Sequence, residues 1–204
     1  YSYGEAPLAI KTLNTNLDLN IKEFVTVNFD AVKEIIDDIG GIQMNITSEE
    51  APHISGITKA GTYNLTGEQA LAYARIRYAT GGDYKRTERM RDVLTAVANK
   101  VKTFNISQLN SLVDQVLPRV YTNITASDIF ALLPSATSFK ITESIGWPYE
   151  TKGKTMDRWY GIPVTLESNV TRLQQEVFEN KNYTPSENVK QISDDIVAKT
   201  GYNN

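Results

Sequence analysis

The chain has 204 residues, of which 41% are hydrophobic, and it carries 21 Lys and Arg against 24 Asp and Glu. This length and composition indicate one sizeable globular domain, or one domain with a small appendage. The chain has no Cys, which excludes a disulfide framework, a thiolate metal site and a Cys nucleophile, and no apolar run approaches the roughly 20 residues that span a bilayer.

The first third of the chain alternates predicted helices and strands. Hydrophobic periodicity, β-branched runs and Gly stops predict, in order, a helix over 5–14, a strand over 24–29, a helix over 30–39, a strand over 42–46 and a polar loop or hairpin over 47–64. Alternation of this kind indicates the α/β class.

The remaining two thirds are predicted to be mainly helical. Thr66 and Gln69 fit a capping box that opens a helix, and Asp83 begins the longest predicted helix, which ends near Phe104. The later predicted elements are helices capped by Ser107 and Thr125, strands over 139–145 and 159–164, and a helix over 168–180. We therefore expect one domain over 1–180, followed by a polar tail or peripheral helix over 181–204.

Five arginines crowd 17 residues of this net acidic chain, at Arg75, Arg77, Arg86, Arg89 and Arg91. Such a cluster favours a site for a defined anion. Arg75 and Arg77 would diverge by about 200° on a helix, whereas on an extended segment they point to the same side. We therefore predict an extended run at 75–78 with both guanidinium groups facing one pocket.

Arg86 lies on the predicted 83–104 helix in line with Met90 and Val93, at the end of the apolar stripe, where an unpaired charge is costly. Cations in the first turns of a helix also oppose the helix dipole, and a bound phosphate would relieve both penalties. The alternative is a structural ion-pair network in which Asp83 and Glu88 pair with two of the arginines. Asp83 could also cap its helix or orient a substrate hydroxyl, and capping is the simplest assignment.

Two other kinds of candidate residue are weaker. His53 is the only histidine, so a His-based triad or zinc site is not expected. Trp147 and Trp159 are interpreted as core or rim packing residues in preference to platforms for stacking sugars.

Three segments resemble the LytR-CpsA-Psr family of bacterial cell-envelope proteins: YSYGEAPLAIKTL, VNFDAVKEIIDDIGGI and LTGEQALAYARIRYATGGDYKRTERMR. The resemblance implies an α/β fold with a mixed central β-sheet sandwiched between helices, and an apolar tunnel for a polyprenyl chain. It also implies that 1–180 is a catalytic domain whose N-terminal portion is missing, because the family's domain begins well before Tyr1.

The resemblance further implies a Mg²⁺-dependent phosphotransferase on the extracellular face of the bacterial cell membrane. Its expected partners are a glycopolymer of the wall teichoic acid or capsular polysaccharide type on polyprenyl pyrophosphate, peptidoglycan, the membrane through an absent N-terminal anchor, and the protein's own missing N-terminal fragment. Nucleic acid is not an expected partner.

The family's site residues map onto this chain one by one. The resemblance assigns Arg75, Arg77 and Asp83 to catalysis, and Arg75, Arg77, Arg86, Arg89 and Met90 to pyrophosphate binding. Met90 stands where the family has glutamine, so one polar contact is lost. The Mg²⁺ ligands are expected in the missing N-terminal part and none in this chain, and the fragment alone is expected to be inactive.

Three alternatives remain open at this point. They are a module that binds polyprenyl pyrophosphate without chemistry, a pyrophosphatase acting on the same lipid, and a cell-envelope-related transcriptional attenuator. The acidic balance and the lack of a clear basic recognition helix count against the last.

Overall fold

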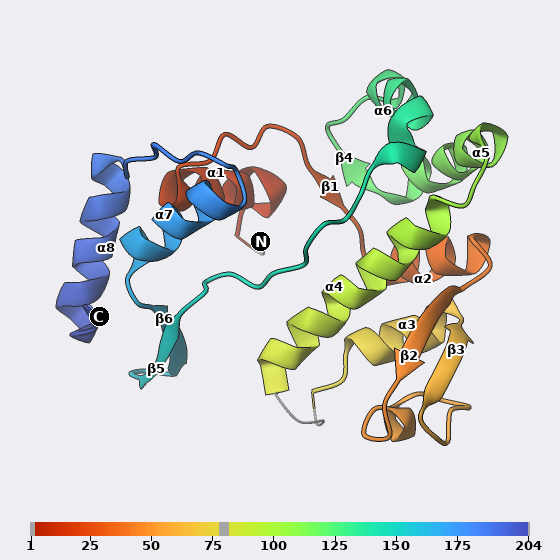
Figure 1. Cartoon of the computed structure of the whole chain (residues 1–204), viewed down its shortest axis with the longest axis horizontal. Helices are drawn as coiled ribbons and strands as arrows, with labels where there is room; N and C mark the ends of the chain where they lie inside the picture. The colour runs from red at the N-terminus through yellow and green to blue at the C-terminus, as the bar shows by residue number, and fades with distance from the viewer. Residues whose placement is uncertain (1–2, 78–81, 204) are drawn as a thin grey trace. The chain divides into compact units, whose positions relative to one another are not determined.

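The computed structural model describes residues 3–77 and 82–203, without the side chains of Asp83 and Thr137. These residues fall into two compact units, a larger one over 23–144 and a smaller one that joins 1–22 to 145–204. Figure 1 labels the elements of both.

The larger unit combines five helices with two pairs of strands. Its elements are β1 (Val25–Thr26), α2 (Phe29–Asp38), β2 (Ile42–Ile46), β3 (Gly61–Leu65), α3 (Gly67–Ala74), α4 (Gly82–Val101), α5 (Ile106–Val116), β4 (Tyr121–Thr122) and α6 (Ala126–Leu132), with 3₁₀ turns η1 (Ala51–His53), η2 (Leu117–Arg119) and η3 (Leu133–Ser138).

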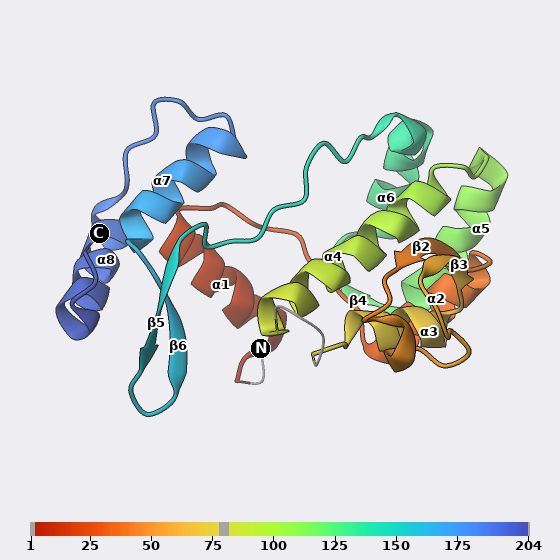
Figure 2. The ribbon, with the colours of Figure 1, turned by 60° about the horizontal axis from the view of Figure 1, so that its bottom comes forward.

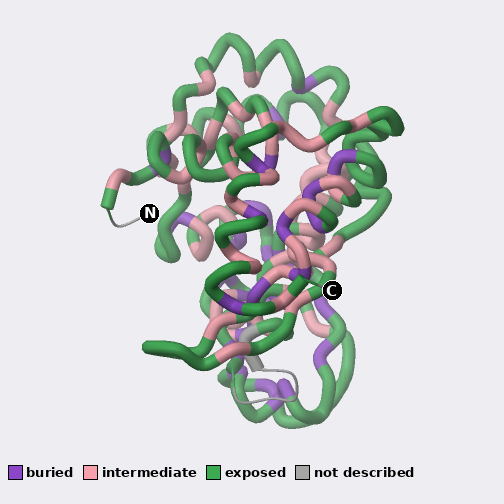
Figure 3. The backbone as a smooth tube through the Cα atoms, turned by 90° about the vertical axis from the view of Figure 1, so that its left-hand side faces the viewer, coloured by how far each residue is buried: buried purple, intermediate pink, exposed green. Residues whose placement is uncertain are grey.

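The core of the larger unit is built on the β2–β3 hairpin. The strands pair antiparallel, from Ile42 opposite Leu65 to Ile46 opposite Gly61, and the residues of β2 are alternately buried and exposed, as expected for a strand with one face toward a core. Along the backbone as a whole, short buried stretches alternate with intermediate and exposed ones (Figure 3). The buried face joins one cluster with residues in α2, just after it, and in α3 and α4: Ile36, Ile39, Ala70, Tyr73 and Val93.

Close contact between α2 and α3 determines where the arginine segment begins. Gly67, the first residue of α3, lies so near α2 that an added Cβ would be 2.0 Å from the carbonyl oxygen of Lys33. Its N–H donates to Asp37 Oδ1 at 2.7 Å, and Thr66 and Gln69 form the predicted capping box. These contacts hold α3 against α2, and α3 ends immediately before Arg75.

The smaller unit contains α1 (Glu5–Leu17), β5 (Thr151–Thr155), β6 (Trp159–Pro163), α7 (Leu166–Glu176) and α8 (Glu187–Thr200), and Figure 2 shows its β5–β6 hairpin. A cluster of Leu17, Leu166, Val170 and Val189 joins the three helices. Of the two predictions for 181–204, a polar tail or a peripheral helix, the structure shows a helix, α8, and its Val189 packs into the core of this unit.

Hydrogen bonds to Asp18 connect the end of α1 to the start of α8. Its carboxylate accepts hydrogen bonds from Tyr183 Oη at 2.6 Å and from Ser186 N and Oγ at 2.9 and 2.7 Å. Burial acts to raise the pKa of Asp18, but these hydrogen bonds outweigh it and leave the pKa below its ordinary value.

The α/β class is confirmed, although the described strands form three two-stranded antiparallel sheets instead of one mixed sheet. The predicted strand over 24–29 is shorter in the structure, where only β1 forms. The reason is that Asn28 Oδ1 accepts a hydrogen bond from Ala31 N at 2.7 Å and caps α2, which begins at Phe29. The predicted strand over 139–145 is wrong, since this stretch is irregular and largely exposed and finds no strand partner among the described residues.

One smaller prediction is corrected and another is made more specific. Asn105, not Ser107, caps α5, since it forms a reciprocal capping box with Gln108 that satisfies the first free N–H groups of the helix. Trp159 packs at the rim and not in the core, since 59% of it is exposed on β6 and its ring lies against Gly153, where an added Cβ would be 2.9 Å from Trp159 Nε1.

Candidate functional site

The C-terminal end of α3 places Arg75 and Arg77 on one side of the chain. Arg75 is the C-cap of the helix, and the chain then leaves the helix, with Ile76 buried between two exposed arginines. Ile76 belongs to the core cluster of the larger unit, so its burial turns both neighbouring guanidinium groups outward. The alternation of side chains is the one predicted, although Arg75 itself keeps a helical backbone (φ −98°, ψ −1°) instead of an extended one, and residue 78 of the predicted run lies outside the described residues.

Arg75 and Arg77 line one cavity together with Arg86 of α4. The cavity has a volume of about 580 Å³, and the other residues that line it are Phe29, Ala74 and Met90. The guanidinium carbon of Arg75 lies 5.3 Å from the centroid of the Phe29 ring, within the range of a cation–π contact. Residues far apart in the sequence thus form a wall that is cationic on one part and apolar on another.

This lining fits an amphiphilic anion. Guanidinium groups bind phosphate through paired hydrogen bonds, while Phe29, Ala74 and Met90 offer apolar surface to an attached chain. Arg77 and Arg86 also interact with other groups of the protein, so a ligand would share or replace those contacts. None of the six described residues that line the cavity carries a carboxylate, the kind of oxygen ligand that Mg²⁺ prefers, and the side chain of Asp83 lies outside the described part of the structure.

Arg89 lies apart from this cavity, in a buried ion pair. Its Nε is 2.8 Å from Glu50 Oε1, and the two side chains are 6% and 9% exposed. Arg89 Nη1 also donates to the carbonyl oxygen of Ile76 at 3.4 Å. The structure therefore groups Arg75, Arg77 and Arg86, whereas Arg89 takes the structural role that the alternative interpretation gave to part of the cluster.

Glu50 is held in its ionised form. The side chain accepts hydrogen bonds from Thr47 N and Oγ1 at 3.0 and 2.9 Å. Burial acts to raise the pKa of Glu50, but these bonds and the Arg89 guanidinium outweigh it and keep the pKa below its ordinary value. Burial and the nearby carboxylates of Glu50 and Asp92 raise the pKa of Tyr73 beside them.

The sequence contained a usable signal for Arg89 but not for Phe29. Arg89 precedes the buried Val93 by four residues, which places both on one helix face, whereas Met90 is 44% exposed. Phe29 lies 46 positions before Arg75 in the chain, so only folding brings the two together. The side chain of Asp83, which was assigned to catalysis, lies outside the described part of the structure.

Fold and cavity together define an α/β protein with a three-arginine cavity that has an apolar wall. The LytR_cpsA_psr family model matches residues 1–177. The chain belongs to this family, as its motifs indicated.

Two curated relatives and one solved structure show the extent of the similarity. The chain is 32% identical to the polyisoprenyl-teichoic acid–peptidoglycan teichoic acid transferase TagT of Bacillus subtilis, over 75% of this chain and 51% of the relative. It is 30% identical to TagU of Enterococcus faecalis, over 89% and 60%. A crystal structure described as a transcriptional regulator from Enterococcus faecalis superposes with a TM-score of 0.76 at 27% identity, over 99% of this chain and 75% of that one.

The chain thus spans between half and two thirds of the length of these two curated relatives. Among the helices of the described residues, none is both long and apolar enough to cross a membrane. The same residues contain no group of three or more His, Asp or Glu side chains that could hold a metal ion.

Proposed function

We propose that this protein is a phosphotransferase of cell-wall assembly that moves an anionic glycopolymer from a polyprenyl pyrophosphate carrier to peptidoglycan. The observation that carries the proposal is the convergence of Arg75, Arg77 and Arg86 on a cavity that also has an apolar wall. The names of the relatives, teichoic acid transferases that act on polyisoprenyl-linked teichoic acid and peptidoglycan, support the same reaction.

In this proposal the arginines hold the pyrophosphate. Arg75 and Arg77 neutralise its charge and stabilise the leaving phosphate, while Arg86 binds from the α4 side. Phe29 and Ala74 contact the first units of the prenyl chain. The cationic part of the cavity wall thus binds the pyrophosphate of the donor, and the apolar part binds its prenyl chain.

The transfer itself is a substitution at phosphorus. A hydroxyl oxygen of the acceptor bonds to the phosphorus that carries the glycopolymer, the bond from that phosphorus to the bridging oxygen breaks, and polyprenyl phosphate leaves. The hydroxyl proton is released. If water replaced the acceptor hydroxyl, the same site would act as a pyrophosphatase, so the acceptor decides between these two activities.

Further parts of the proposal rest on the family resemblance. They are a wall teichoic acid or capsular polysaccharide cargo, a location on the extracellular face of the cell membrane, and dependence on Mg²⁺. Because the described cavity wall offers no carboxylate, no step of the mechanism is assigned to the metal here. The residues of this chain act by binding and orienting the pyrophosphate.

Calorimetric titration with a short-chain polyprenyl pyrophosphate tests the proposal. The double variant Arg75→Ala/Arg77→Ala is expected to bind the lipid at least about 100-fold more weakly, because two charge-assisted contacts of about 1.5–3 kcal/mol each are lost. Arg91→Ala is the matched control, since Arg91 comes from the same cluster but donates to Ser144 Oγ at 3.3 Å on the surface. Unchanged binding in the double variant would show that the cavity is not the pyrophosphate site.

A transfer assay with a labelled lipid-linked donor then separates the activities. Label on peptidoglycan supports the transferase, and release of polyprenyl phosphate with no labelled peptidoglycan identifies a pyrophosphatase. Binding without either product identifies a lipid-binding module.

A further inference from the structure

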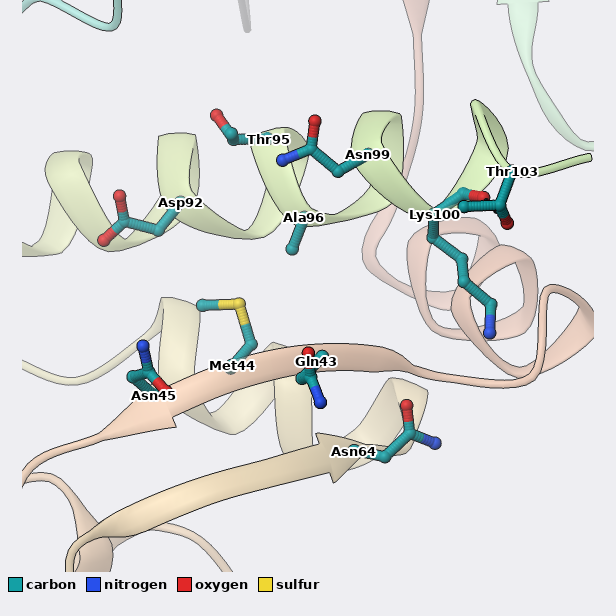
Figure 4. A pocket seen from close by; sticks show the side chains of 10 residues that line it. All are labelled: Gln43, Met44, Asn45, Asn64, Asp92, Thr95, Ala96, Asn99, Lys100 and Thr103. Carbon is teal, nitrogen blue, oxygen red and sulfur yellow. Dashed lines mark hydrogen bonds between the residues drawn. The ribbon is translucent and has the colours of Figure 1, made fainter.

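A second depression on the larger unit lies between α4 and the β2–β3 hairpin (Figure 4). This α4–β2 groove has a volume of about 630 Å³. It is lined by Gln43, Met44, Asn45 and Asn64 of the hairpin and by Asp92, Thr95, Ala96, Asn99, Lys100 and Thr103 in and just after α4. Amide and hydroxyl side chains dominate this lining, in contrast to the arginine cavity.

The groove and the arginine cavity lie on different faces of α4. Asp92, Thr95 and Asn99 are spaced by three and four residues and so form one stripe along the helix. Met90, which lines the arginine cavity, precedes Asp92 by two positions, a rotation of about 200° around the helix. A ligand in the groove would therefore be separated from the pyrophosphate site by the body of α4.

Internal hydrogen bonds fix several of the polar groups in the groove. Asn45 Oδ1 accepts from Thr62 Oγ1 at 2.5 Å, and Asn64 Nδ2 donates to the carbonyl oxygen of Gly40 at 3.0 Å. Asp92 Oδ2 accepts from Tyr73 Oη at 3.2 Å. Each amide has hydrogen-bonding capacity beyond this one contact, so these groups are oriented and can still bind a ligand.

Other lining side chains have no hydrogen-bond partner among the residues that the structure describes. They are Gln43, Thr95, Asn99 and Lys100. Gln43 of β2 and Asn99 of α4 line the groove from its two walls, and both are exposed. The groove therefore presents donors and acceptors from both of its walls.

We propose that the α4–β2 groove binds a neutral, N-acetylated glycan strand. Amide side chains both donate and accept, as do sugar hydroxyls and acetamido groups, so four amides and two hydroxyls match such a chain. The charged residues of the lining, Asp92 and Lys100, have opposite signs, so the groove has no net attraction for a polyanion. A glycopolymer rich in phosphate fits this lining less well than a neutral glycan does.

This inference deepens the proposed function. The binding of a neutral glycan is argued from the groove itself, and only the identification of that glycan as the strand of the peptidoglycan acceptor rests on the proposed function. The groove binds the strand, and no step of the reaction is placed there. Because α4 separates the groove from the arginine cavity, the groove can hold one part of a long polymer while another part reaches the phosphorus.

The test uses the linear tetramer of N-acetylglucosamine as the probe, with NMR detection of side-chain and backbone amides. We expect shifts at the side-chain amides of Gln43, Asn45, Asn64 and Asn99. Cellotetraose, which lacks acetamido groups, should bind at least about tenfold more weakly, as should the tetramer to the Gln43→Ala/Asn99→Ala variant, because about 1.4 kcal/mol of hydrogen bonding is a factor of ten. Asn110→Ala, an exposed position on α5, is the matched control and should bind normally.

Several results would overturn the inference: no binding, equal binding of both tetramers, or shifts that map away from the groove. Pairing of an extended peptide along β2 without any response to the sugars would also overturn it and identify a peptide site. The Arg75→Ala/Arg77→Ala variant separates this test from that of the proposed function, since it should lose lipid binding and keep glycan binding.

Discussion

Two arginines on α4, three residues apart, have opposite environments. Arg86 lines an open cavity beside Met90 and an aromatic ring, whereas Arg89 is buried against Glu50 and a backbone carbonyl. On an ideal helix the two positions differ by only about 60° of rotation. The comparison shows that the role of an arginine in a cluster is decided by what the fold places opposite it.

The difference is energetic as well as geometric. A buried charge without its partner is costly, so Arg89 and Glu50 are needed together for stability. A charge at the edge of an open cavity stays partly hydrated and can exchange a protein contact for a ligand. We therefore expect substitutions on the Glu50 side to change stability and substitutions on the Arg86 side to change binding.

The largest expected effect comes from Glu50→Gln. The substitution keeps the size of the side chain but leaves the Arg89 guanidinium buried without a counter-charge, which should cost about 3–5 kcal/mol of unfolding free energy. Urea unfolding followed by circular dichroism measures this. Glu88→Gln is the matched control, because Glu88 pairs with Lys85 at 2.8 Å on the surface and surface pairs contribute about 1 kcal/mol or less. Similar losses in both variants would contradict the distinction.

The second prediction concerns how the stability contributed by Glu50 depends on pH. The pKa of Glu50 is lowered in the folded protein from an ordinary value of 4.5, so its ionised form stabilises the fold. This contribution is complete above pH 4.5 and is lost as the pH falls through the lower folded pKa. Urea midpoints measured from pH 7 to pH 3 should therefore show the difference between wild type and Glu50→Gln shrinking below pH 4.5. Asp18, whose pKa is also lowered, contributes equally to both proteins and cancels in this difference.

The smallest expected effect is on the cavity side. Met90→Gln should add one polar contact to the pyrophosphate and tighten lipid binding about fivefold, since a hydrogen bond contributes about 1 kcal/mol. Because Met90 is 44% exposed, unfolding free energy should change by less than about 0.5 kcal/mol. Calorimetry measures the affinity, with Leu94→Gln, a 62% exposed position one turn further along α4, as control. Weaker binding would contradict this prediction. It would mean that the apolar contact between Met90 and the prenyl chain is worth more than a hydrogen bond from an amide to the pyrophosphate.

Local rules recovered much of the fold. The capping box at Thr66, the cap at Thr125, the strand over 42–46 and the alternation at Arg75 to Arg77 depend on neighbours within a few residues. The error in the predicted strand over 24–29 also has a local cause. The side chain of Asn28 caps α2, so the helix begins where the β-branched and aromatic residues predicted a strand. The family motifs added the grouping of Arg75, Arg77 and Arg86 as candidate site residues.

The sequence by itself determined the α/β class, the family and the residue types of the candidate site, because these depend on periodicity, caps and short motifs. Only the tertiary structure decided that Glu50 neutralises Arg89, that Phe29 completes the wall of the arginine cavity, and that polar residues of β2 and α4 face one groove. The physical reason is separation along the chain. Glu50 and Arg89 are 39 positions apart. No local sequence pattern predicts which distant side chain will pair with a buried one.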